Sequence, residues 1–97
     1  MPEKIKLRHP IEWDGKEITE VNLDLEKITG ADLVDAEREY LAIGGTPTSL
    51  PLSATYQMCI AAKGAGLDLE AVRAMKARDC SALLLRVQGF LLDMGEV

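Results

Sequence analysis

The sequence predicts an α+β domain, with an N-terminal β-hairpin followed by a small bundle of about four α-helices. Residues 4–13 alternate between apolar and polar side chains, which is the period of a half-buried strand, and Asp14-Gly15 follows them as a hairpin turn. After residue 29 the apolar residues recur at three- and four-residue spacing, as in amphipathic helices. The chain has 97 residues, enough for one core, so we expect a single domain with residues 1–28 as a hairpin arm and residues 29–97 as a helical part.

The first strand is expected over residues 4–13, and Pro10 predicts an edge or a bulge within it because proline cannot donate to a β-ladder. Its apolar face comprises Ile5, Leu7, His9, Ile11 and Trp13. The return strand is expected over about residues 18–25. Ile18 is out of phase with Val21 and Leu23, which predicts a bulge or a change of register near Thr19-Glu20.

The first two helices have clear start and stop signals. Thr29 and Asp32 have the spacing of an N-terminal capping box, and Gly44-Gly45 ends the first helix. Ser53 is expected to cap a second helix through about residue 63. That helix is almost uncharged, so we place it centrally.

Two aspartates mark the expected starts of the last two helices. Asp68 is expected to cap a short helix over residues 69–77, and Asp79 a longer one over residues 80–94. The longer helix is apolar all round. Leu83, Val87, Phe90 and Met94 share one side, whereas Leu85 and Leu92 point nearly the opposite way.

A helix that is apolar on two sides must be covered on both, either inside the fold or by another chain. The sequence leaves both alternatives open for Leu85 and Leu92. Trp13, just before the hairpin turn, is likewise either a core anchor or a partner anchor.

Charge argues against several classes of function. With 11 basic and 16 acidic residues, the formal net charge is −5, which disfavours a non-specific nucleic-acid or anionic-membrane binder. A helix-turn-helix after Gly66 would use four basic residues on phosphates, but the last helix lacks the polar face that a major groove requires. These residues are Arg73, Lys76, Arg78 and Arg86. Pro47 and other helix breakers interrupt the uncharged residues 40–62, so we expect no membrane-spanning helix.

The residue types predict no catalytic, cofactor or metal site. His9 is the only histidine, and no nucleophile or carboxylate is placed beside it by spacing. Cys59 and Cys80 lie in apolar helical patterns, where cysteine behaves as a small hydrophobe, and two such cysteines are typical of a reducing cytoplasm. The acidic residues have no metal-ligand spacing, and no glycine cluster forms a phosphate loop.

Several segments, in their order and spacing, resemble the small tail assembly chaperones of long-tailed bacteriophages and prophages, of the Mu-like type. The resemblance runs from about residue 5 to residue 92. Its segments are His9-Pro10-Ile11, Asp14-Gly15-Lys16, Ile28-Thr29-Gly30-Ala31-Asp32-Leu33 with Ala36-Glu37, Ser53 with Tyr56, Ala61-Ala62-Lys63, Ala77-Arg78-Asp79 and Val87-Gln88-Gly89-Phe90-Leu91-Leu92. Cys80 departs from the family, which has an aromatic residue after the Arg-Asp pair.

The resemblance implies a non-enzymatic protein of the bacterial host cytoplasm. Such proteins hold the long helical tape-measure protein soluble and help to recruit tail tube subunits. We therefore expect partners of these two kinds, with a homo-oligomer as a further possibility, and neither nucleic acid nor membrane. Leu85, Leu92 and Trp13 are the predicted partner-binding residues. The alternative hypothesis is a structural subunit of the tail or baseplate.

Overall fold

The computed structural model describes residues 2–46 and 52–93. Its elements are β1 (Glu3–Trp13), β2 (Lys16–Leu23), the 3-10 turn η1 (Leu25–Lys27), α1 (Gly30–Ala42), α2 (Ala54–Ala65), α3 (Leu69–Ala74) and α4 (Ala77–Asp93). An antiparallel two-stranded hairpin followed by four helices confirms the predicted α+β class.

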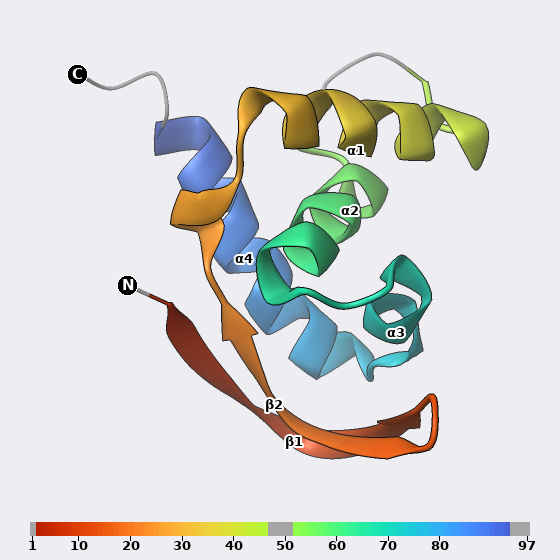
Figure 1. Cartoon of the computed structure of the whole chain (residues 1–97), viewed down its shortest axis with the longest axis vertical. Helices are drawn as coiled ribbons and strands as arrows, with labels where there is room; N and C mark the ends of the chain where they lie inside the picture. The colour runs from red at the N-terminus through yellow and green to blue at the C-terminus, as the bar shows by residue number, and fades with distance from the viewer. Residues whose placement is uncertain (1, 47–51, 94–97) are drawn as a thin grey trace.

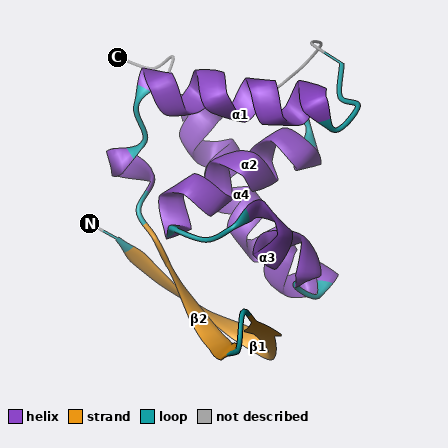
Figure 2. Ribbon diagram, turned by 45° about the vertical axis from the view of Figure 1, so that its right-hand side comes forward, coloured by secondary structure: helices purple, strands orange, loops and turns teal. Residues whose placement is uncertain are grey.

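The hairpin lies at one end of the molecule and α1 crosses the other end, with α2 and α4 between them (Figure 1). Helix α2 contacts α1, α3, α4 and β2, so the prediction of a central position is confirmed. The view in Figure 2 shows α3 beside the N-terminal end of α4. Within the described residues, α1 and α4 each keep a side with exposed apolar side chains.

One core joins the hairpin to the helices. Apolar side chains of β1 and β2 pack with those of α1, α2 and α4, and the largest fully buried ones come from the helices. The hairpin contributes Ile5, Leu7, Val21 and Leu23; the fully buried set is Ile60, Leu83, Val72, Val87 and Cys59.

The predicted irregularity of the hairpin is confirmed. Ile5 pairs with Val21 and Ile11 pairs with Ile18, and the register shifts between these two pairs, where β1 contains Pro10. Because the shift is by an odd number of residues, Ile18 and Val21 both face the helices although they are out of phase along β2.

The turn follows the predicted chemistry, but two details of the hairpin differ from expectation. Asp14 (φ 55°) and Gly15 (φ 76°) both have the positive φ of a tight two-residue hairpin. His9, expected on the apolar face, is exposed because it lies within the register shift. β2 ends at Leu23 rather than near residue 25, since the N–H of Asp24 donates to the carbonyl of Gly64 and takes the chain onto α2.

The caps of α1 and α2 are confirmed. Thr29 Oγ1 accepts the N–H of Asp32 at 3.2 Å, and Asp32 accepts the N–H of Thr29 at 2.9 Å. Ser53 Oγ accepts the N–H of Tyr56 at 3.3 Å. Helix α2 runs past Gly64 to Ala65, and its C-cap is Gly66, whose φ of 69° suits glycine.

Asp68 is the N-cap residue of α3, as predicted, whereas the cap predicted at Asp79 is wrong. The Asp68 side chain makes no cap hydrogen bond, and α3 ends at Ala74 because Met75 is extended. Helix α4 begins at Ala77, which places Asp79 inside its first turn. The Asp79 carboxylate instead accepts the N–H groups of Arg8 and His9, each at 2.9 Å. Met94, expected on the same side of this helix as Leu83, lies outside the described residues.

Candidate functional site

The outer side of α4 carries two of the three most exposed large apolar side chains among the described residues. Leu85 is 69% exposed and Leu92 is 55% exposed, whereas Leu83 and Val87 on the opposite side are fully buried. Gly89 lies between the two leucines on the same side, and a Cβ added there would meet nothing within 4 Å. We call Leu85, Gly89 and Leu92 the α4 stripe. Leu85 and Leu92 flank the position of Gly89, where the missing side chain leaves a notch that exposes the backbone.

Side-chain contacts join α4 to β1. Arg86 donates to Glu3 Oε2 at 2.6 Å and to the carbonyl of Ala82 at 2.7 Å, which ties the helix to the start of β1. At its N-terminus Asp79 binds the β1 amides, and these hydrogen bonds lower the pKa of its carboxyl, with Arg8 contributing most. Helix α4 is therefore joined to β1 in its first turn and near its middle.

Trp13 is half-buried at the tip of the hairpin. Its Nε1–H donates to Asp68 Oδ2 at 3.2 Å, and the ring borders a shallow depression of about 280 Å³ that includes Ile18 and Leu67. The hairpin tip and the C-terminal end of α4 lie at opposite corners of the molecule (Figure 1). The structure therefore does not bring Trp13 together with Leu92.

A second apolar surface, which the sequence analysis did not identify, lies between α1 and α3. Ile43 directly follows α1 and is 49% exposed. Leu67 comes from the α2–α3 connection and Leu69 begins α3, and all three line one depression of about 430 Å³. The sequence signal was weak: these residues stand beside glycine and aspartate at helix ends, where no long periodic pattern includes them.

Burial disfavours the reactive thiolate form of both cysteines. Cys59 is fully buried, and desolvation raises the pKa of its thiol to about 11. Burial also raises the pKa of Cys80. Neither thiol has the electropositive, exposed setting of a nucleophile.

Within residues 2–46 and 52–93, no group of three or more histidine, cysteine, aspartate or glutamate side chains is arranged to hold a metal ion. In the same part of the chain, no helix is long and apolar enough to cross a membrane.

Comparison with known proteins gives one family. A family model described as phage tail assembly chaperone proteins, E, or 41 or 14, matches residues 4–92. The match spans the hairpin, all four helices and the α4 stripe. Searches of curated proteins and of solved structures return no match.

Proposed function

Because the chain belongs to the family of phage tail assembly chaperones, we propose that it acts without catalysis, by binding the tape-measure protein and assisting assembly of the tail tube. The observation that carries this proposal is the α4 stripe. Two leucines that are more than half exposed, on a helix whose other side is fully buried, form a surface suited to an apolar partner.

The chemistry of a tape-measure protein suits this surface. A long amphipathic helix aggregates unless its apolar side is covered. A helix of another protein covers that side when its own apolar residues recur at three- and four-residue spacing. Leu85, Gly89 and Leu92 have this spacing. The notch at Gly89 allows a partner helix to approach the backbone closely.

The remaining surface of the protein is consistent with an escort that must stay soluble. The chain has a net charge of −5, and acidic residues improve solubility more than basic ones. We place the protein in the host cytoplasm, where its two free, buried thiols would stay reduced. We also propose that residues 1–28 and 29–97 fold as one unit, which the shared core supports.

Co-expression tests this function. The tape-measure protein encoded by the same phage or prophage is produced with and without the chaperone, and its soluble fraction is measured after lysis. We expect the tape-measure protein to be mostly insoluble alone and soluble with the chaperone, with which it should co-purify. A soluble fraction that does not change on co-expression contradicts the proposal.

Mass spectrometry of purified virions separates a chaperone from the alternative of a structural subunit. A chaperone leaves before the particle is complete, so its peptides should be absent from virions that contain the tail tube protein. Stoichiometric amounts in the tail would instead identify a subunit of the tail or baseplate.

A further inference from the structure

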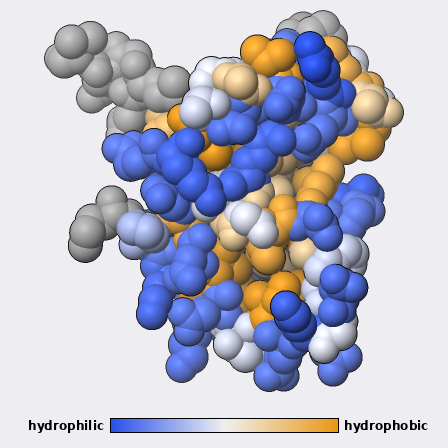
Figure 3. Space-filling view, viewed as in Figure 1, coloured by the Kyte–Doolittle hydropathy of each residue, from blue (hydrophilic) through white to orange (hydrophobic). Residues whose placement is uncertain are grey.

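The depression between α1 and α3 has an apolar floor that is open to solvent. Its apolar lining is Ala42, Ile43, Ala62, Leu67 and Leu69, and we call this surface the α1–α3 groove. The volume of about 430 Å³ gives room for several apolar side chains of a partner. Figure 3 shows apolar surface gathered between a hydrophilic band over α1 and the hydrophilic lower part of the molecule.

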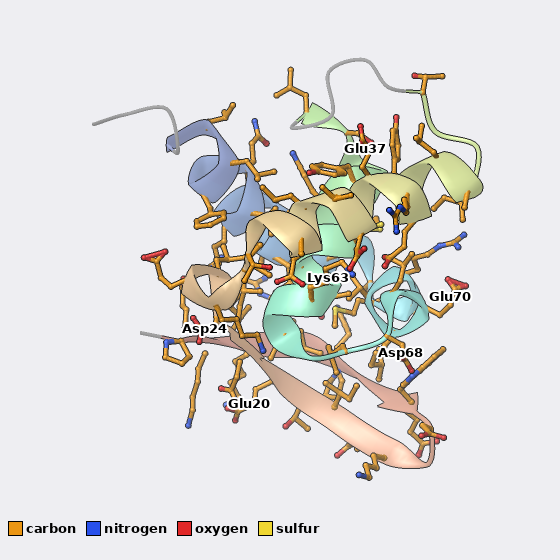
Figure 4. All side chains as sticks on the ribbon, turned by 45° about the horizontal axis from the view of Figure 1, so that its top comes forward. Glu20, Asp24, Glu37, Lys63, Asp68 and Glu70 are labelled. Carbon is orange, nitrogen blue, oxygen red and sulfur yellow. The ribbon has the colours of Figure 1, made fainter. Side chains whose placement is uncertain are left out.

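The charged residues that line the groove are Glu39, Asp68 and Lys63, with a formal sum of −1. Glu39 of α1 accepts from Lys63 Nζ at 2.9 Å along one edge, and Asp68 stands at another. Figure 4 shows Lys63 between α1 and α2, with Asp68 near α3. The Glu39 hydrogen bond contributes most to raising the pKa of Lys63, and Asp35 and Asp32 raise it further.

These electrostatic contacts show that an acidic row extends from the groove along α1. Asp32, Asp35 and Glu39 have the spacing of one helix side. With Asp68, they are four carboxylates. Three cations lie near this row: Lys63, Arg38, which lies 3.9 Å from Asp35, and Lys27, which lowers the pKa of Asp32, so the formal sum is −1. An apolar floor beside a net negative border defines the chemistry of its occupant.

We propose that the α1–α3 groove binds an amphipathic helix whose apolar side is bordered by lysine or arginine. Such a helix places its apolar residues over Ile43, Leu67 and Leu69 and its cations beside the carboxylates of α1 and Asp68. A helix bordered by acidic residues would meet like charge. A second copy of this chain, with its net charge of −5, is disfavoured for the same reason. The inference rests on the proposed function in one respect, that the helix belongs to the tape-measure protein.

Two designed 18-residue peptides test the charge preference. Both carry leucine on one side of the helix; one has lysine along both borders and the other has glutamate at the same positions. Binding to the full-length chain is measured by fluorescence anisotropy at low and moderate salt. We expect the lysine peptide to bind at least tenfold more tightly than the glutamate peptide, with an affinity that falls as salt screens the border. Equal affinities would overturn the charge argument.

Two substitutions of equal exposure locate the binding surface. Ile43→Ser removes a groove side chain that is 49% exposed, and Val34→Ser removes an α1 side chain outside the groove that is also 49% exposed. Both should leave the helical circular dichroism signal unchanged. We expect Ile43→Ser to weaken the lysine peptide about tenfold and Val34→Ser less than twofold. Equal effects of the two variants would overturn the assignment.

Backbone NMR and charge reversal give independent readouts. The lysine peptide should shift the amide signals of Ala62, Leu67 and Leu69 more than those of α4, and larger shifts in α4 would assign the peptide to the α4 stripe instead. Asp35→Lys, at an exposed position, should weaken binding of the lysine peptide and strengthen binding of the glutamate peptide.

A lysine peptide that binds in the groove while co-expression leaves the tape-measure protein insoluble refutes the proposed function alone. Successful co-expression without groove binding refutes only the groove assignment.

Discussion

Replacing both leucines of the α4 stripe by serine probes the proposed function directly. Leu85 and Leu92 are 69% and 55% exposed, so most of each side chain is available to a partner and a smaller part supports the fold. Full burial of a leucine side chain is worth about 2 kcal/mol. If the partner covers the exposed parts, they contribute about 1.4 and about 1.1 kcal/mol, scaling that value by exposure.

The double variant Leu85→Ser/Leu92→Ser should therefore lose about 2.5 kcal/mol of binding free energy, which is roughly a 70-fold increase in Kd. The parts that are already buried are worth about 1.5 kcal/mol together on the same scale. A domain of this size has a free energy of unfolding of about 5–15 kcal/mol, so the variant should stay folded, with a Tm lowered by roughly 6–12 °C.

The assay is isothermal titration of the purified chaperone with a soluble fragment of the tape-measure protein, paired with thermal unfolding followed by circular dichroism. The matched control is Val34→Ser/Leu41→Ser on α1, because these residues are 49% and 43% exposed and have the same seven-residue spacing. The control should change Kd less than threefold.

Two results would refute the reasoning. If the folded α4 variant binds within threefold of the wild type, the α4 stripe is not the contact surface. If the α4 variant unfolds at room temperature while the α1 control stays folded, Leu85 and Leu92 act as core residues, despite their exposure.

Three further predictions concern the fold behind the surface. Asp79→Asn should lower Tm at pH 7, because the side-chain amide offers only one acceptor oxygen to the two backbone amides of β1. Those amides lower the pKa of the Asp79 carboxyl, so the wild type should lose its stability advantage as the pH falls below about 4. Equal Tm values of the two proteins at pH 7 would contradict this prediction. Gly64→Val should destabilise the protein by about 1–3 kcal/mol in urea unfolding, because even a Cβ at this position lies 3.1 Å from a methyl group of Leu23; a stabilised variant would show that the contact yields easily. Cys59 and Cys80 should react with a thiol reagent at pH 7.5 only in urea, since burial raises the pKa of both thiols; rapid modification of the native protein would contradict their buried placement.

Local signals predicted most elements of the fold. The hairpin turn at Asp14-Gly15 and the capping box of Thr29 and Asp32 depend on atoms within four residues of one another, so the sequence alone identifies them. Pro10 predicted the hairpin irregularity for a similarly local reason. The family resemblance, stated from short segments, is confirmed by a match over residues 4–92.

Signals that join distant parts of the chain were misinterpreted. Asp68 and Asp79 were assigned as helix caps because aspartate before an apolar run usually is one. Asp68 does occupy the N-cap of α3, but its side chain makes no cap hydrogen bond, and Asp79 lies inside α4. In the structure Asp68 accepts from Trp13, 55 residues away, and Asp79 accepts from amides 70 and 71 residues away. No sequence pattern encodes these partners, since they become neighbours only after the hairpin packs on the helices.

The α4 stripe could be predicted in part from the sequence, whereas the α1–α3 groove could not. The sequence by itself determined that α4 is apolar on two sides, because helical periodicity places Leu83 opposite Leu85. Only the tertiary structure decided which side enters the core and which stays exposed, because β1 and α2 pack on one side of the helix alone. It also created the α1–α3 groove, whose lining comes from helix ends that approach one another when α1 and α3 pack around α2.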